Sequence, residues 1–101
     1  MDWLWTWGGE FFGYRDDQEL WTAEGRHVGR FSGEDIYGAN GSYLGEIMND
    51  NRLIRNKAKA SWRQGACSPF ARRTAYARYA NYAGYNVYSG FEDFAGSGTF
   101  K

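Results

Sequence analysis

Large apolar residues recur through the first half of the chain at a fixed spacing of sixteen residues. When the sequence is written in rows of sixteen from Trp5, without a gap, the first column contains Trp5, Trp21, Tyr37 and Leu53. The eighth column contains Phe12, Val28 and Leu44, and the residues that precede the first column are Leu4, Leu20 and Ile36. Apolar columns in constant register indicate an internal repeat of one supersecondary unit.

Glycine fills two further columns of the repeat. The fifth column contains Gly9, Gly25 and Gly41, and the ninth contains Gly13, Gly29 and Gly45. The residues around the first column favour a strand, and a glycine four positions later can adopt the positive φ of a tight hairpin loop. The second glycine falls within the return strand, where it predicts a bulge or the close approach of a neighbouring backbone. Each row therefore predicts one β-hairpin.

Bends at equal spacing would curl these hairpins around a common axis. We then expect the eighth-column residues to meet near the axis and the first-column residues to pack between adjacent hairpins. A single hairpin is marginally stable in water, so the units must stabilise one another. The sequence thus predicts an all-β domain over residues 1–63, built from four short hairpins with pseudo-four-fold symmetry.

The segment from Glu10 to Asn56 resembles the four-fold beta-flower domain, a small bacterial family of four hairpins around a pseudo-four-fold axis. The resemblance is carried by the residues EFFGYRDDQELWTAEGRHVGRFSGEDIYGANGSYLGEIMNDNRLIRN. It implies the fold and no activity, cofactor or catalytic residue. The fourth unit departs from the pattern, because Lys57 stands at the turn-glycine position and Ala60-Ser61 at the apolar-glycine pair.

Past residue 63 the sixteen-residue register is lost, and residues 64–101 form a Tyr-, Gly- and Ala-rich arm or tail. From Phe70 large residues recur at every third position, most of them Tyr, through to Phe94. A period of three does not give one face of an α-helix, but it aligns side chains in a polyproline-II or 3₁₀ segment. Three structures are compatible with this pattern: a disordered tail, an extended arm over the hairpins or over a neighbouring subunit, and a helix over Arg72–Ala83.

The net charge of zero conceals a division between the halves of the chain. Residues 1–50 hold ten acids and three Arg, whereas residues 51–101 hold nine bases and two acids. The basic block has no acid between positions 51 and 80, and its members are Arg52, Arg55, Lys57, Lys59, Arg63, Arg72, Arg73 and Arg78. These residues are candidate contacts for nucleic acid, beside aromatic stacking faces, or for the acidic hairpins of the same or a sister chain.

The sequence contains little catalytic chemistry. Cys67 is the only thiol and His27 the only imidazole, and they lie forty residues apart. Two such ligands are too few for a structural zinc site, and one Cys excludes an internal disulfide. The adjacent carboxylates Asp16-Asp17 and Glu34-Asp35 fall where hairpin-linking turns are expected, and Asp is common in turns.

We therefore expect a protein that is not an enzyme and has no cofactor or metal. No apolar run approaches the roughly 20 residues of a membrane span, no signal peptide is visible, and the single Cys suits a reducing cytoplasm. The hypothesis from sequence is a binding or assembly module that forms a homo-oligomer through its C-terminal arm and its oppositely charged halves. Nucleic-acid binding through residues 51–80 is the alternative, and a small-molecule ligand is not expected.

Overall fold

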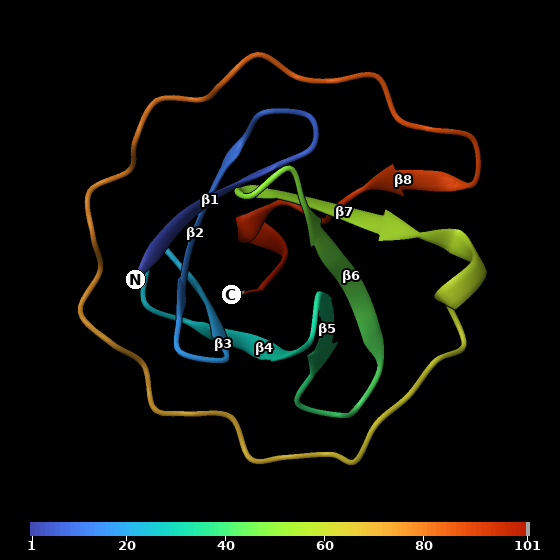
Figure 1. Ribbon diagram of the computed structural model, residues 1–101. Coiled ribbons are helices and arrows are strands. Elements are labelled where there is room, and N and C mark those ends of the chain that lie inside the picture. The colour runs from blue at the N-terminus through green and yellow to red at the C-terminus, as the bar shows by residue number, and fades with distance from the viewer. Residues whose placement is uncertain (101) are drawn as a thin grey trace.

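The computed structural model describes residues 1–100 as an almost entirely β structure (Figure 1). In chain order the elements are β1 (Asp2–Thr6), β2 (Phe11–Asp16), β3 (Glu19–Thr22), β4 (His27–Ser32), β5 (Asp35–Gly38), β6 (Tyr43–Met48), β7 (Arg52–Asn56), the 3₁₀ turn η1 (Lys57–Lys59), β8 (Phe91–Asp93) and the 3₁₀ turn η2 (Ser97–Thr99). The all-β hairpin repeat expected from the sequence is thereby confirmed.

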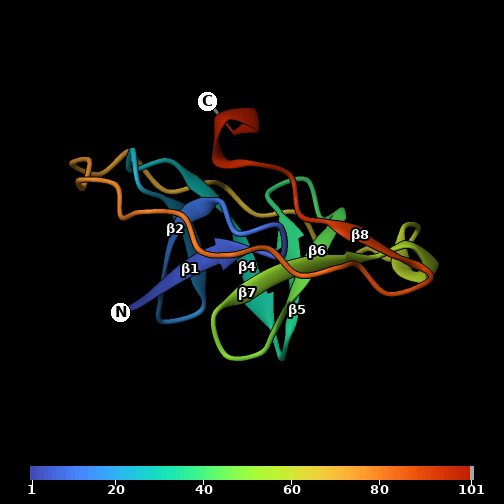
Figure 2. The same cartoon turned by 90° about the horizontal axis from the view of Figure 1, so that it is seen from above.

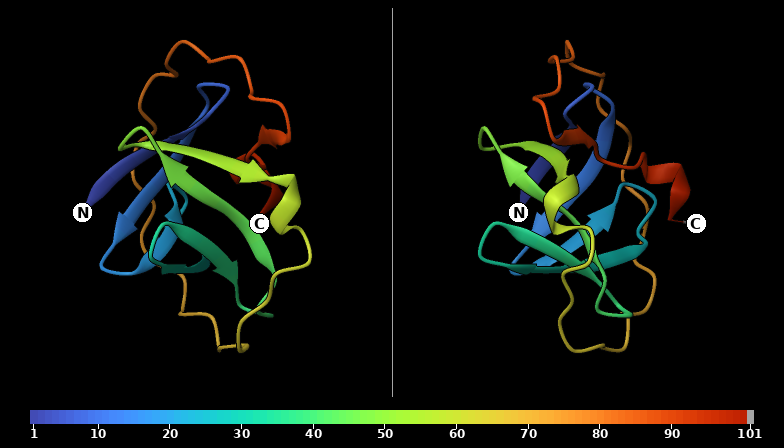
Figure 3. Two further views of the ribbon diagram at one scale, coloured as in Figure 1. Left: turned by 45° about the vertical axis from the view of Figure 1, so that its right-hand side comes forward. Right: turned by 90° about the vertical axis from the view of Figure 1, so that its right-hand side faces the viewer.

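Strands β1 to β7 form a closed barrel. Consecutive strands are antiparallel, and a parallel pairing of β1 with β7 closes the ring. The β1–β2, β3–β4 and β5–β6 hairpins point outward from the shared centre (Figures 1 and 3). The hairpins correspond to the first three rows of the sequence repeat.

Each of the three hairpins contains the same irregularity. The pairing shifts after Leu4, Leu20 and Ile36, so that one residue of the return strand has no partner. The extra residue is Phe12, Val28 or Leu44, the apolar residue of the eighth column. The following glycine lies against the next strand, and a Cβ at Gly13 or Gly29 would overlap the carbonyl oxygen of Trp21 or Tyr37. The ninth-column glycine therefore both follows a β-bulge and allows the backbone of the next strand to approach closely.

The bulges direct the eighth-column side chains into one core. Phe12, Val28 and the partly buried Leu44 pack with the residues that precede the first column: Leu4, Leu20 and Ile36. The first-column aromatics Trp5, Trp21 and Tyr37 are also buried, and each packs on a ring in the return strand of its own hairpin: Phe11, His27 and Tyr43. Trp5 and Trp21 also contact the arm, and only Trp21 is seen to stack on a ring of the adjacent hairpin, that of Tyr14. One hairpin cannot bury these side chains alone, so the core exists only when the ring is closed.

The fourth unit differs from its expected register by one residue. The β6–β7 connection has three residues between the paired positions Met48 and Arg52, whereas the two earlier connections have two. Leu53 therefore occupies the core position of Leu4, and Ile54 rather than Leu53 takes the first-column position. An alignment of the fourth unit with the first three therefore needs one gap between Met48 and Arg52, whereas the sixteen-residue rows were written without a gap.

The fourth hairpin is also not made from consecutive residues. After β7 the chain leaves the ring, and β8 returns from the far end of the arm to pair with the second half of β7. Phe94, which follows β8, joins the core, and Phe100 packs against it. The two ends of the chain thus build one hydrophobic core.

Between β7 and β8 the arm, defined here as residues 64–90, circles the barrel as an extended strap (Figure 1). Seen from above it lies close to one plane, with η2 on one side and strand connections on the other (Figure 2). No helix forms over Arg72–Ala83. Of the three possibilities left by the sequence, the arm adopts the extended one and covers its own hairpins.

The arm is attached to each hairpin tip by two backbone hydrogen bonds. Amides of Gln64, Arg73 and Tyr82 donate to the turn glycines Gly41, Gly25 and Gly9, at 2.8 to 2.9 Å. The amides three residues later donate to Ala39, Ala23 and Trp7, at 2.7 to 3.0 Å. The attachment points are therefore nine residues apart on the arm and sixteen residues apart on the hairpins. The arm reaches the third hairpin first and the first hairpin last.

The turn glycine is needed at these contacts for two reasons. Gly25 has a φ of +90°, and a Cβ there would overlap the carbonyl oxygen of Arg73 on the arm. We expect Gly25→Ala to lower the free energy of unfolding by more than the roughly 1–2 kcal/mol of left-handed backbone alone, because the arm must also move away. Urea unfolding and proteolysis at Arg72 and Arg73 measure the two effects.

Gly33→Ala is the matched control, because Gly33 has a φ of +62° but no atom lies within 4 Å of the position that a Cβ would occupy. It should incur the backbone cost alone and leave the arm resistant to protease. Equal losses in the two variants would show that the arm does not rest on the tip of the hairpin.

Candidate functional site: the arm surface and an arginine pocket

The basic block pairs with the acidic hairpins of the same chain. Lys59 Nζ lies 2.9 Å from Asp35 Oδ1 and 3.2 Å from Glu46 Oε1. Arg73 lies 2.8 Å from Asp16, and Arg78 lies 3.1 Å from Glu24. The opposite charges of the two halves are thus partly neutralised within one molecule.

Two of these ion pairs stabilise the charged form of the base. The hydrogen bond to Asp35 raises the pKa of Lys59, and the Glu46 carboxylate adds to this effect against the opposing effect of burial. The hydrogen bond to Asp16 likewise raises the pKa of Arg73. Both groups remain cationic at neutral pH, so these links between arm and hairpins persist there.

The other bases of the block are dispersed around the ring. Arg55 pairs with Glu92 at 2.6 Å across β7 and β8, and Arg63 donates to Ser42 and Asn40 at the third hairpin. The guanidinium of the buried Arg52 donates to the carbonyls of Thr6, Trp7 and Ala83, and it lies 4.4 Å from the ring centre of Tyr85. Arg72 donates to the carbonyl of Glu24. The side chain of Lys57 is exposed, and it forms no hydrogen bond, ion pair or cation–π contact with residues 1–100.

The arm, together with Trp62 just before it, presents aromatic rings to solvent. These half-exposed rings, with 44% to 54% of their surface accessible, belong to Trp62, Phe70, Tyr76, Tyr79, Tyr82, Tyr85 and Tyr88. Their inner surfaces pack on the hairpins. Tyr82 stacks on Trp5 with ring centres 4.0 Å apart, and Tyr79 meets Trp3 edge-on at 5.0 Å. We call these half-exposed rings the aromatic belt.

The tryptophans that receive the belt were only partly identified from the repeat. Trp5 stands in the first column, but Trp3 and Trp7 do not. Trp7 is buried beneath Tyr85 and Tyr88, and its indole N–H donates to the carbonyl of Asn86 at 2.9 Å. The three Trp residues among the first seven positions could have indicated the surface on which the arm packs.

The buried imidazole of His27 joins a hairpin to the arm. Its Nε2 lies 2.7 Å from Glu19 Oε1, and its Nδ1 accepts a hydrogen bond of 3.0 Å from the backbone N–H of Phe70. An ionised carboxylate can only accept, so Nε2 carries the ring proton and Nδ1 is unprotonated. The Phe70 ring stacks on the imidazole with centres 4.7 Å apart. His27 therefore links the β3–β4 hairpin to the arm, with one ring nitrogen bound on each side.

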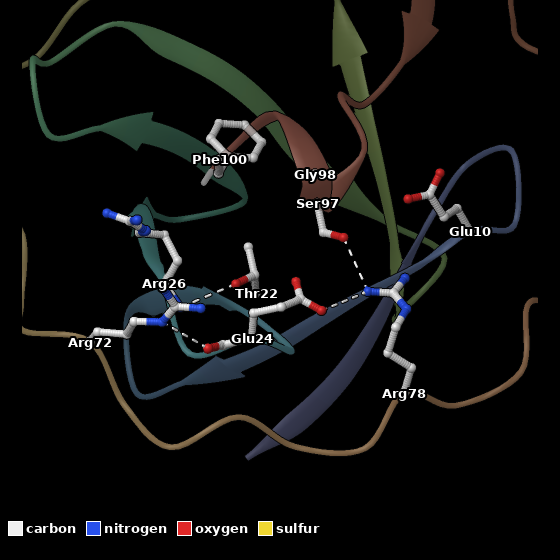
Figure 4. Close-up of a pocket in the computed structure, with 9 residues that line it drawn as sticks. All are labelled: Glu10, Thr22, Glu24, Arg26, Arg72, Arg78, Ser97, Gly98 and Phe100. Atoms are coloured by element: carbon white, nitrogen blue, oxygen red, sulfur yellow. Dashed lines mark hydrogen bonds and ion pairs between the residues drawn. The ribbon is translucent and has the colours of Figure 1, made fainter.

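A pocket of about 540 Å³ opens at one end of the barrel (Figure 4). Four separate segments line it. The β3–β4 hairpin contributes Thr22, Glu24 and Arg26, the tip of the β1–β2 hairpin contributes Glu10, the arm contributes Arg72 and Arg78, and the last residues described contribute Ser97, Gly98 and Phe100. Of its residues only Arg72 and Arg78 belonged to the basic block identified from sequence.

Arg78 is the best anchored of the three arginines in the pocket. Its Nη1 lies 3.1 Å from Glu24 Oε2 and 3.2 Å from Ser97 Oγ, and its Nη2 donates to the carbonyl of Phe11. Arg72 uses only Nε, which donates to the carbonyl of Glu24 at 3.2 Å. The terminal nitrogens of Arg72 and the guanidinium of Arg26 have no ion pair among the described residues.

His27, Asp16 and Asp35, which were considered for catalysis, form other contacts. Both nitrogens of His27 are bound, so the ring cannot activate the thiol of Cys67. Asp16 and Asp35 each pair with a base of the opposite half of the chain. No cluster of three or more His, Cys, Asp or Glu among residues 1–100 could hold a metal ion.

Comparison with known families, curated proteins and solved structures gave no match to the chain. The two short 3₁₀ turns are the only helical elements in the described part of the chain, and neither could cross a bilayer.

The His27 contact predicts a local effect of substitution. In His27→Phe the backbone N–H of Phe70 loses its nitrogen acceptor, so NMR should show faster hydrogen exchange at Phe70 than in the wild type. The amide of Arg73, whose acceptor is a carbonyl, should be unchanged. A Phe70 amide that exchanges at the wild-type rate would contradict the arrangement.

Proposed function

We propose that the protein is a non-catalytic binding module that associates with a second copy of itself through the aromatic belt. The observation that carries this proposal is the belt of seven half-exposed aromatic rings, of which Tyr76 to Tyr88 follow one another at every third residue of the arm. Large exposed apolar patches mark interaction sites on soluble proteins. Tyr and Trp are also the residues that contribute most to protein–protein contacts.

The distribution of charge favours a protein partner over nucleic acid. Most bases of the 51–80 block are bound to acids or carbonyls of the same chain, and they are spread around the ring. Phosphate binding depends on uncommitted Lys and Arg gathered on one surface. The self-association expected from sequence is therefore proposed for the belt, not for the charged halves.

Two further proposals accompany this function. The three bulged hairpins in constant register support membership of the four-fold beta-flower family. The single Cys67, half-buried and unpaired by a disulfide, suits a reducing cytoplasm. Neither proposal alters the test of self-association.

Sedimentation velocity over a range of concentrations tests the self-association. We expect the wild-type mass to rise from monomer towards dimer, and Val87→Asp to weaken the dimer about tenfold or more by burying a charge. Val87 lies on the arm, is 49% exposed and forms no aromatic pair, so the monomer should remain folded.

Gln18→Asp is the control, because Gln18 is exposed on a hairpin connection away from the arm and accepts from Arg15. It adds the same charge and should leave the dimer intact. A wild type that stays monomeric at all concentrations refutes the proposal. A monomer that binds single-stranded DNA or RNA, with affinity falling steeply with salt, would favour the nucleic-acid alternative.

A further inference from the structure

The pocket at the end of the barrel combines unpaired positive charge, hydroxyl groups and an aromatic wall. Its volume of about 540 Å³ falls in the range of small-molecule sites. The segments that form it are fixed independently of any ligand: the two hairpins by the barrel, the arm by its tip contacts and the chain end by Phe94 in the core. The pocket is therefore pre-formed.

The charges of the pocket divide into bound and unbound groups. Arg78 and Glu24 neutralise one another at 3.1 Å. Arg26, Arg72 and Glu10 form no ion pair among residues 1–100, and they leave one net positive charge in the lining. Figure 4 shows Arg26 and Arg72 together on one side of the pocket, with Glu10 on the other. A ligand with one negative charge would balance this set.

Two hydroxyl groups form part of the lining. Thr22 Oγ1 accepts from the amide of Arg26 at 3.1 Å, and Ser97 Oγ accepts from Arg78 at 3.2 Å. Both residues are buried, and the hydrogen bonds of the described residues leave the O–H of each without an acceptor. Because a buried hydroxyl ordinarily donates as well as accepts, these groups suit an anionic or polar ligand.

Phe100 supplies the apolar part of the pocket. Its ring is partly buried and packs beside Phe12 and Phe94, with centres 5.8 and 6.2 Å away. Its position in the lining is thereby fixed, and Figure 4 shows it on the same side of the pocket as Arg26. The body of a small organic ligand can pack against this ring while its charged end reaches the guanidinium groups.

We propose that this pocket binds a small organic monocarboxylate, with its carboxylate held by Arg26 and Arg72 and its body packed against Phe100. Guanidinium groups bind planar carboxylates through paired N–H donors. A phosphate monoester shares the anionic chemistry but carries up to two charges, and Glu10 and Glu24 oppose the second. The proposal is independent of self-association through the belt.

Benzoate is the probe, and benzyl alcohol and phenyl phosphate are its neutral and dianionic counterparts. Binding is followed at pH of about 8 by NMR shifts of the Thr22, Ser97 and Phe100 amides. We expect benzoate to bind and benzyl alcohol not to bind. Arg26→Gln and Arg72→Gln should each weaken benzoate about tenfold, as expected for loss of a charge-assisted hydrogen bond.

Glu10→Gln tests the same assignment in the opposite direction, because removal of a carboxylate from the lining should strengthen benzoate binding. Lys57→Gln removes an exposed charge outside the pocket and should change nothing. Thermal unfolding verifies that each variant folds. The proposal is overturned if benzoate does not bind, if both Arg variants bind it unchanged, or if phenyl phosphate binds more tightly.

Discussion

The fold depends on contacts between an arm without regular secondary structure and the tips of three hairpins. Each tip accepts two backbone hydrogen bonds from the arm, and its glycine allows the arm to approach. A hairpin exposes polar main-chain groups at its turn, and a strap that satisfies them links one hairpin to the next. The barrel and the strap therefore stabilise each other, because neither half of the chain buries its aromatic residues alone.

The dimensions of the molecule explain why nine arm residues match sixteen hairpin residues. The chain forms a disc of 36 × 34 × 21 Å, and the distance around such a disc is about 110 Å. Nine residues with a rise of about 3.1 Å each, as in extended polyproline-II structure, span about 28 Å, or one quarter of that path. The arm thus advances by one hairpin per nine residues, and a period of three keeps its aromatic rings in phase with the tips.

The sequence determined the hairpins more clearly than the arm. Their period, turn glycines and bulge glycines are local features, and they predicted the three hairpins and the core around Phe12 and Val28. The fourth unit was misaligned by one residue because the turn at Asn49–Asn51 is longer by one than its equivalents. A pattern of side chains does not record the length of a turn.

The path of the arm and the pocket could not be read from the sequence for a related reason. The arm is positioned by backbone amides, which every residue except Pro possesses, so its attachment leaves little trace in residue type. The pocket draws Arg26, Arg72 and Phe100 from three distant segments, and only closure of the ring brings them together. The charge division, in contrast, was visible in the sequence, and the ion pairs between arm and hairpins account for part of it.

Amide hydrogen exchange along the arm tests the central claim most directly. If the strap rests on the hairpin tips, slow exchange should recur in pairs nine residues apart, at Gln64 and Cys67, Arg73 and Tyr76, and Tyr82 and Tyr85. Phe70, which donates to His27, should also exchange slowly, whereas the arm amides of Ala66, Ala75 and Asn86, which have no acceptor among the described residues, should exchange quickly. Uniformly fast exchange from residue 64 to 88, with a protected barrel, would show that the hairpins fold without the strap and would contradict this account.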